Sequence, residues 1–182
     1  LANQFLIAMP SMDGSYFGRS LTYICEHDDQ GAMGLVVNKT TDMSVGKLLK
    51  EIKINDEVIP QLAEQKVLSG GPVQTDRGFV LHSGNREWSS SLHLDDNIMV
   101  TTSKDILQNL ATEDGPNDFI LALGYAGWSA GQLEDELADN VWLTVDADPE
   151  LIFNTPVDKR WEKAVQKLGI DISQLAAFAG HA

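Results

Sequence analysis

Residues 5–39 read FLIAMPSMDGSYFGRSLTYICEHDDQGAMGLVVNK, and the rest of the fold can be worked out from this stretch. Leu21, Tyr23 and Cys25 alternate with their neighbours in the two-residue period of a half-buried strand. The polar run at residues 27–31 ends in a glycine, and residues 33–38 suit a sheet. We therefore predict an antiparallel hairpin with an acidic tip, in which Cys25 faces the same way as Leu21 and Tyr23.

The rest of the chain alternates short strand and helix patterns. Strand-like apolar runs occur at residues 66–68, 78–82, 98–102, 119–123 and 141–145. Helical patterns occur at residues 45–52 with Ser44 as N-cap, after Ser103 as a second N-cap, and at residues 149–153, 158–168 and 172–178. We interpret residues 56–65 as a short broken helix and residues 83–97 as mostly loop. This order predicts a single α+β domain over residues 1–182, with a mixed, largely antiparallel sheet system flanked by helices.

Residues 119–131 place an apolar strand before the glycine-rich run GYAGWSAG, and a helical pattern starts at Gln132. This order imitates a dinucleotide-binding fingerprint. Two details favour a structural role instead. Trp128 occupies space that a pyrophosphate would need, and residues 134–136 are all acidic where the helix begins. We therefore interpret the glycines as a turn that lets a helix pack close to a strand.

The charge of the chain restricts its partners. It has 27 acidic and 13 basic residues, for a net charge of −14. Duplex DNA is itself a dense line of negative charge, so direct nucleic-acid binding is disfavoured. Lys159, Arg160, Lys163 and Lys167 share one helical pattern, but acids interleave with them, so we expect a solvated helix face.

Hydropathy and cysteine content indicate the compartment. No apolar run approaches the roughly 20 residues that cross a bilayer, and no stretch has the pattern of a secretory signal. A single cysteine permits no internal disulfide, which fits a reducing environment. We therefore expect a cytoplasmic protein with no membrane contact.

Three strings of sequence resemble a known family. They are AMPSMDGSYFGRSLTYICEHDDQGAMGLVVNK at residues 8–39, VLSGGPVQTDRGFVLHS at residues 67–83 and FILALGYAGWSAGQLEDELADNVWL at residues 119–143. In this order they resemble the bacterial AlgH/YqgE family over most of the chain. The resemblance implies the same fold class and a regulatory role, because one member named the family as a regulator of alginate production. It implies no catalytic mechanism.

Cys25 is the residue with the greatest intrinsic reactivity. A thiolate is a nucleophile and can be oxidised, so Cys25 is a possible redox handle. His27 lies two residues further along the strand, which projects both side chains to one face, and His82 and His93 are other conceivable bases. The acidic neighbours of Cys25 oppose thiolate formation, and a lone cysteine aligned with apolar residues is typical of a small buried hydrophobe.

Polar and glycine residues within the three strings are candidates for lining a pocket. They are Ser11, Arg19, Asn38, Gly71, Pro72, Arg77, Gly127 and Trp128. The polar members could equally satisfy buried backbone groups at strand ends. We predict no metal site and no cofactor, because the acidic run after Cys25 lacks a second group of ligands at the expected spacing.

These patterns contain no complete catalytic set. We therefore predict a cytoplasmic, non-enzymatic regulatory or adaptor protein that acts through protein partners. The alternative is an enzyme or small-ligand-binding protein that uses a cleft lined by the glycine-rich strings.

Overall fold

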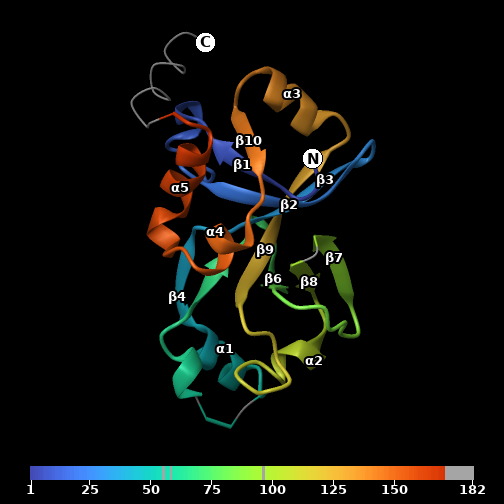
Figure 1. Cartoon of the computed structure of the whole chain (residues 1–182), viewed down its shortest axis with the longest axis vertical. Coiled ribbons are helices and arrows are strands. Elements are labelled where there is room, and N and C mark those ends of the chain that lie inside the picture. The colour runs from blue at the N-terminus through green and yellow to red at the C-terminus, as the bar shows by residue number, and fades with distance from the viewer. Residues whose placement is uncertain (55, 58, 96, 171–182) are drawn as a thin grey trace.

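The computed structural model describes residues 1–54, 56–57, 59–95 and 97–170. It is built on one ten-stranded, mostly antiparallel sheet that curls on itself (Figure 1). The strand order is β10-β1-β2-β3-β9-β6-β8-β7, and β4 and β5 lie off this path. β5 pairs with β9 in parallel, so the sheet is mixed. The predicted α+β class is confirmed.

One end of the strand order surrounds the N-terminal hairpin. Its strands are β1 (Gln4–Ala8), β2 (Leu21–Asp28), β3 (Gly31–Val36) and β10 (Trp142–Asp146). β2 and β3 form the predicted hairpin, with Tyr23 opposite Leu35 and Asp28 opposite Gly31. Leu21, Tyr23 and Cys25 belong to one core cluster, as the alternation predicts.

The other end of the sheet extends away from this hairpin. Its strands are β4 (Thr40–Ser44), β5 (Lys66–Ser69), β6 (Val73–His82), β7 (Ser91–Asp95) and β8 (Ile98–Thr101). The long strand β9 (Phe119–Ser129) serves both ends, because its first half pairs with β6 and its second half with β3. The prediction that residues 83–97 are mostly loop is wrong where β7 forms.

The glycine-rich segments interlock through their backbones. A Cβ added to Gly70 would lie 2.4 Å from the Gly124 carbonyl oxygen, and one added to Gly71 would lie 2.0 Å from the Tyr125 carbonyl carbon. β9 runs through Gly124, which has a φ of +80°. The strand therefore includes residues 124–129, which the sequence predicts as a turn. The predicted turn is wrong for residues 124–129, although Gly131 does lie in the turn before α3. The structural role is confirmed at Gly124, where an added Cβ would lie 2.3 Å from the Gly71 carbonyl oxygen.

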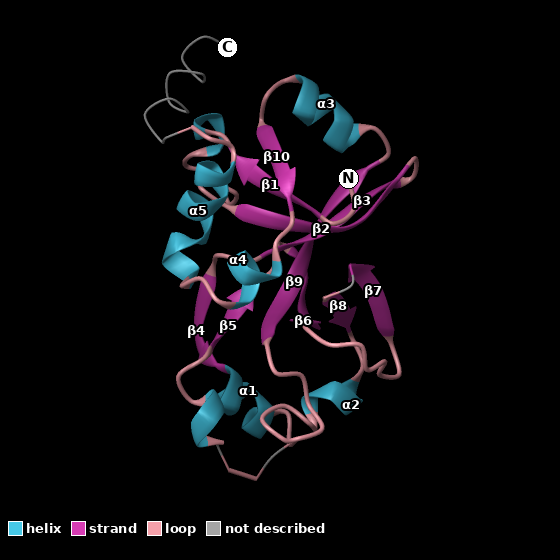
Figure 2. Ribbon diagram, viewed as in Figure 1, coloured by secondary structure: helices cyan, strands magenta, loops and turns pink. Residues whose placement is uncertain are grey.

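Short helices cover the ends and one flank of the sheet (Figure 2). The α-helices are α1 (Val45–Glu51), α2 (Lys104–Leu107), α3 (Gln132–Ala138), α4 (Pro149–Phe153) and α5 (Arg160–Lys167), and the 3₁₀ turns are η1 (Pro10–Met12), η2 (Pro60–Leu62) and η3 (Val157–Lys159). Ser44 caps α1 by accepting from the Lys47 amide, as predicted. Ser103 holds the N-cap position of α2, but its hydroxyl donates to Asp105 instead. The predicted helix at residues 172–178 lies outside the described residues. No helix in the described part of the chain is long and apolar enough to span a membrane.

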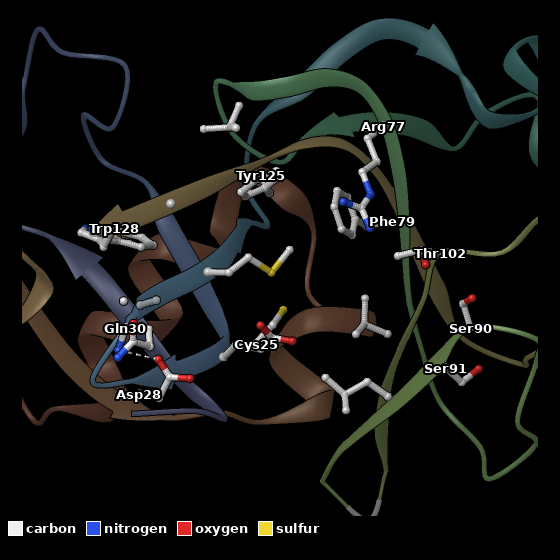
Figure 3. Close-up of a pocket in the computed structure, with 18 of the residues that line it drawn as sticks. Cys25, Asp28, Gln30, Arg77, Phe79, Ser90, Ser91, Thr102, Tyr125 and Trp128 are labelled. Atoms are coloured by element: carbon white, nitrogen blue, oxygen red, sulfur yellow. Dashed lines mark hydrogen bonds between the residues drawn. The ribbon is translucent and has the colours of Figure 1, made fainter. Parts of the chain in front are cut away.

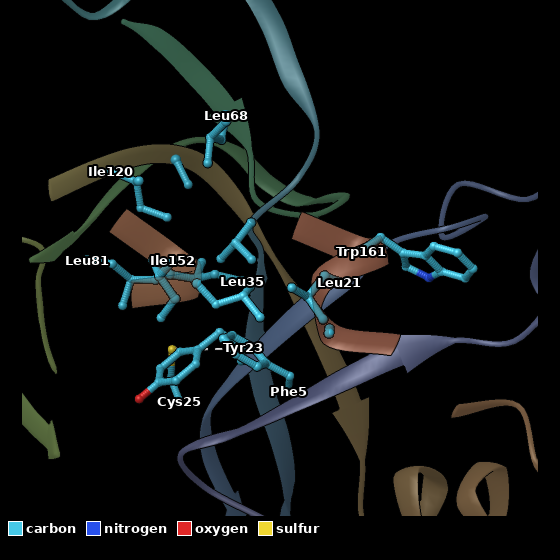
Figure 4. Close-up of a cluster of buried hydrophobic side chains, with 14 of the residues drawn as sticks. Phe5, Leu21, Tyr23, Cys25, Leu35, Leu68, Leu81, Ile120, Ile152 and Trp161 are labelled. Carbon is cyan, nitrogen blue, oxygen red and sulfur yellow. Dashed lines mark hydrogen bonds between the residues drawn. The ribbon is translucent and has the colours of Figure 1, made fainter. Parts of the chain in front are cut away.

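The largest core cluster connects the hairpin with β6, β8, α4 and α5 (Figure 4). Phe5, Tyr23 and Leu35 are fully buried in it, and each such side chain stabilises the fold by about 1.5–3 kcal/mol. Arg160 of α5 is also buried, with Nη1 donating to the Val37 carbonyl at 2.5 Å. The prediction that Arg160 belongs to a solvated helix face is therefore wrong.

Candidate binding cleft

A cleft of about 1040 Å³ lies between the tip of the β2–β3 hairpin and strands β6, β7 and β8 (Figure 3). It lies where β6 separates from β9. Gly78 pairs with Leu123 and Val73 with Tyr125, so residues 74–77 of β6 lie opposite the single residue Gly124. This irregularity takes residues 74–77 out of the ladder with β9 and leaves them exposed.

The floor of the cleft is apolar and continuous with the main core. Cys25, Phe79 and Val100 belong to the core cluster, and Met33 and Tyr125 pack against it. The rings of Phe79 and Tyr125 meet edge to face, with centroids 5.9 Å apart. An apolar group that enters the cleft would therefore contact fixed core side chains.

The rim of the cleft is mainly acidic. Glu26, Asp28 and Glu87 line it together with one cation, Arg77. The Arg77 guanidinium lies 5.2 Å from the Phe79 ring centroid, and no carboxylate in the described residues pairs with it. Three acids against one base give the rim a net negative charge, which favours basic groups nearby.

Cys25 lies at the cleft floor, but its thiol is protected. The residue is 3% exposed, and Sγ approaches the Tyr23 carbonyl oxygen at 4.0 Å. Burial raises the pKa of the thiol far above its ordinary value, and the charge of Glu26 raises it further. The side chain therefore behaves as a small hydrophobe in this state, with very little of the thiolate that redox chemistry needs.

His27 does not share a face with Cys25. The ladder between β2 and β3 contains a bulge between Ile24 and Glu26, which breaks the two-residue alternation at Cys25. The Nε2 of His27 lies 2.8 Å from Glu134 of α3, on the opposite side of the sheet. The expected same-face placement is therefore wrong, and the reason is the bulge.

A chain of hydroxyl groups runs from the cleft wall to a buried histidine. The Oγ of Ser91 lies 2.7 Å from Oγ1 of Thr101, and that atom lies 2.7 Å from Nε2 of His82. His82 is 1% exposed, and its Nδ1 lies 3.0 Å from the Ser83 carbonyl oxygen. Burial lowers the pKa of His82, so this imidazole is neutral at pH 7.

The cleft ends beside β9 at Gly127 and Trp128. The indole Nε1 of Trp128 donates to Glu136 at 3.0 Å, and Trp142 Nε1 donates to the same carboxylate oxygen at 2.9 Å. Trp128 is 7% exposed, so its ring is a wall rather than a mobile lid. Gly127 is exposed in the strand and leaves the edge of the cleft open.

The pocket residues predicted from sequence divide into two groups. Arg77, Gly127 and Trp128 line the cleft together with Cys25. Arg19 and Asn38 lie at the other end of the hairpin, where the Asn38 side chain accepts from the Leu21 amide and donates to the Arg19 carbonyl.

The remaining predicted residues do not reach the cleft. Ser11 is exposed in η1, and Pro72 is exposed beside Gly71, which packs on the β9 backbone. The predicted set is therefore not a single site.

Sequence reasoning missed the wall that β7 and the preceding serines supply. Ser89, Ser90 and Ser91 line the cleft with Leu92, which is 42% exposed. The alternation of Ser91 and His93 with Leu92 and Leu94 was the available signal, because a two-residue period indicates a strand. Within the described residues, no three His, Cys, Asp or Glu side chains are grouped so that they could hold a metal ion.

Comparison with known proteins places the whole chain in one family. A family model described as AlgH-like matches residues 5–173. A UPF0301 protein of Pseudoalteromonas translucida is 57% identical over 182 residues, covering 100% of this chain and 98% of the relative. A UPF0301 protein of Vibrio parahaemolyticus is 53% identical over 186 residues, covering 100% and 99%.

Two solved structures share the fold. The AlgH protein from Pseudomonas aeruginosa superposes with a TM-score of 0.82 at 44% identity, covering 100% of this chain and 95% of that one. A protein from Corynebacterium diphtheriae superposes with a TM-score of 0.70 at 20% identity, covering 91% and 85%. The protein therefore belongs to the AlgH-like family.

Proposed function

We propose that this protein is a non-enzymatic regulatory protein of the bacterial cytoplasm, and that it acts by binding a segment of a protein partner in the cleft. The regulatory role is what the resemblance of the three sequence strings to the AlgH/YqgE family implies, and the chain belongs to the AlgH-like family. The binding role rests on the cleft itself, which combines an open mouth with a floor made of core side chains.

The single observation that carries the proposal is the continuity of the floor with the core. Met33, Phe79 and Tyr125 present a fixed apolar surface, and Leu92 adds an exposed apolar side chain at the mouth. A pocket of this kind takes an apolar anchor residue from a partner, because burying one such side chain contributes about 1.5–3 kcal/mol. The serine-rich wall offers hydroxyl groups to a partner backbone.

The charge of the rim decides the flanking residues of that partner segment. Glu26, Asp28 and Glu87 surround the floor, and the chain as a whole carries −14. We therefore expect lysine or arginine beside the apolar anchor of the partner, which speeds association and selects against acidic segments.

A matched pair of surface variants tests this proposal. Leu92 at the cleft and Ile52 after α1 are both exposed apolar residues, at 42% and 39%. In a pull-down with purified bait, Leu92→Asp should reduce capture of a specific partner about tenfold, and Ile52→Asp should leave capture unchanged. The measurement is made under reducing and oxidising conditions, so that any dependence on Cys25 is visible. The absence of a specific partner in both conditions, or equal loss in both variants, would refute the proposal.

A small-ligand-binding role is the second candidate, and the size of the cleft favours it. Its volume is near the upper end of the range for sites that enclose drug-sized molecules. Arg77 stacked on Phe79 would then recognise an anionic group on the ligand. A thermal-shift screen with nucleotides and acyl compounds distinguishes the two, because a dose-dependent rise in Tm for one compound favours the small ligand.

A further inference from the structure

Unpaired positive charge collects at the base of the β2–β3 hairpin, at the end opposite the cleft. Arg19, Lys39 and Arg160 gather around the segment 37–39 that leaves β3. None of the ion pairs among the described residues includes any of the three. In a chain with 27 acids and 13 bases, three cations without a carboxylate need a physical explanation.

Contacts to three consecutive residues place the Arg160 side chain and the backbones of Arg19 and Lys39 in one region. Arg160 Nη1 donates to the Val37 carbonyl at 2.5 Å, and Arg160 Nε donates to the Thr155 carbonyl at 3.0 Å. The Asn38 amide donates to the Arg19 carbonyl at 2.9 Å, which fixes the Arg19 backbone at a φ of +52°. Lys39 follows directly, and its carbonyl accepts from the Ser69 amide at 2.8 Å.

Aromatic rings hold the two more accessible cations. The Arg19 guanidinium carbon lies 4.4 Å from the Trp161 ring centroid, and the Lys39 ammonium lies 4.4 Å from the Tyr16 ring centroid. The Tyr16 hydroxyl is fixed by Ser69 at 2.5 Å. Stacking on a ring holds a cation in place and leaves its outer donors available to a ligand.

Arg160 supplies an independent observation. The residue is only 5% exposed, yet its two hydrogen bonds go to neutral carbonyl groups, and no acid among the described residues pairs with it. A buried guanidinium without an anionic partner is costly, because its charge has lost water and gained no counter-charge. Burial lowers the pKa of Arg160 to about 10, so the side chain stays protonated at pH 7. Binding of an anion nearby would relieve this cost.

We propose that Arg19, Lys39 and Arg160 form an anion site that binds the phosphate or carboxylate group of a small molecule. Guanidinium and ammonium donors recognise both groups, since each presents charged acceptor oxygens. A small ligand suits the site better than duplex DNA, because the net charge of −14 repels a polyanion as a whole. Tyr16, which is 39% exposed, lies beside the site and would flank the rest of the ligand.

The indole resonances of the full-length protein test this site directly. Trp161 Nε1 donates to the Ala8 carbonyl, and its ring lies under Arg19. We expect inorganic phosphate or acetate, titrated at constant ionic strength, to shift the Trp161 indole signal in ¹H–¹⁵N spectra in a saturable way. The indole signals of Trp128 and Trp142, which share Glu136, should shift far less. A response to phosphate alone, to acetate alone or to both supports the site and identifies the preferred group.

Charge-removing variants decide whether the shift comes from these residues. Lys39→Met and Arg19→Met should each weaken the apparent affinity about tenfold, because each removes one charged donor. Arg86→Met removes an exposed arginine that also lies over a ring, with its guanidinium carbon 4.0 Å from the Trp88 ring centroid, and should leave the affinity unchanged. An Arg160 variant that fails to fold would give no information about the site. Lys39→Met and Arg19→Met still test it, because their spectra show whether each variant is folded. No saturable shift with either anion, or a shift that survives both variants, would overturn the proposal.

Discussion

The tip and the base of one β-hairpin present opposite chemistry. At the tip, Glu26 and Asp28 edge a cleft whose floor is apolar. At the base, Arg19, Lys39 and Arg160 collect around the residues that leave β3, and no acid in the described structure pairs with them. The two ends belong to the same pair of strands and to the same core cluster.

The difference arises from what packs around the hairpin. The bulge of β6 opens a cleft beside the tip, and β7 and β8 form its far wall. The base is instead covered by the η1 loop and α5, which bring in Arg19 and Arg160. The strand pair is therefore a rigid scaffold, and the side chains that determine the chemistry of each end come from segments distant in sequence.

Gly70→Ala should break the frame that holds both ends, with the largest effect. Its Cβ would lie 2.4 Å from the Gly124 carbonyl oxygen and 3.1 Å from Ala122 Cβ. Backbone atoms at this distance cannot move independently of β5 and β9, so we expect a loss of about 3 kcal/mol or more in the free energy of unfolding. Chemical denaturation measures it.

Gly78→Ala is the matched control in the same family-like string. A Cβ at Gly78 would have ordinary contacts at 3.9 Å, and its φ is not in the left-handed region. We expect the free energy of unfolding to change by less than about 1 kcal/mol. Equal destabilisation by both substitutions would show that the interlocked glycines are not what joins the two ends.

Thiol labelling sharpens the description of the tip. Cys25 is 3% exposed and its pKa is raised by burial, so reaction with an aromatic disulfide reagent at pH 8 requires local opening. We expect labelling of the native protein to be about 100-fold slower, or more, than labelling in denaturant. A native rate close to the denatured rate would mean that the cleft floor is open to solvent and that Cys25 remains a redox candidate.

A change in pH should lower the stability of the cleft wall at the tip of the hairpin and leave the base unaffected. We expect this effect to be smaller than those above. Burial lowers the pKa of His82 behind the cleft wall, whereas the cations at the base are arginine and lysine. In the unfolded chain histidine titrates near 6.5. The stability that neutral, buried His82 contributes to the folded protein is therefore fully present above about pH 6.5. As the pH falls toward the lower pKa of the folded state, the free energy of unfolding decreases by up to about 1.4 kcal/mol per pH unit.

His82→Gln tests this pH dependence. The variant should have a flatter decline in the free energy of unfolding between pH 7 and pH 5.5 than the wild type. His93→Gln removes a neighbouring imidazole whose charge also lowers the pKa of His82, so it should flatten the decline less than His82→Gln does. If His82→Gln leaves the slope as steep as in the wild type, the neutral His82 does not contribute to the stability of the wall.

The strands, turns and helix caps could be predicted from the sequence better than the surfaces at the two ends of the hairpin. The hairpin, the Ser44 cap and the structural role of the glycines follow from local rules of strand alternation, capping and backbone freedom. The same rules fail at β7, where the alternation of an edge strand is too weak to distinguish it from loop. They also fail along β9, where the strand continues past Gly124 because residues 71–75 pack against that glycine and β3 pairs with residues 126–129.

The site depends on placements that no local pattern encodes. Arg160 looked like part of a solvated helix face, but it reaches the Val37 carbonyl, which lies far away in the sequence. The bulge at Cys25 could not be read from its neighbours, so the face on which His27 projects was misassigned. Arg77 and Trp128 meet at the cleft only because β6 bends away from β9.

We expect a protein partner to bind in the cleft at the tip of the hairpin. Site-specific photo-crosslinking in living cells tests it most directly, with a photoreactive residue placed at Leu92 or, as control, at the equally exposed Ile52. We expect an adduct from position 92 alone, and a crosslinked peptide in which an apolar residue lies beside lysine or arginine. Equal adducts from both positions, or none from position 92, would contradict it.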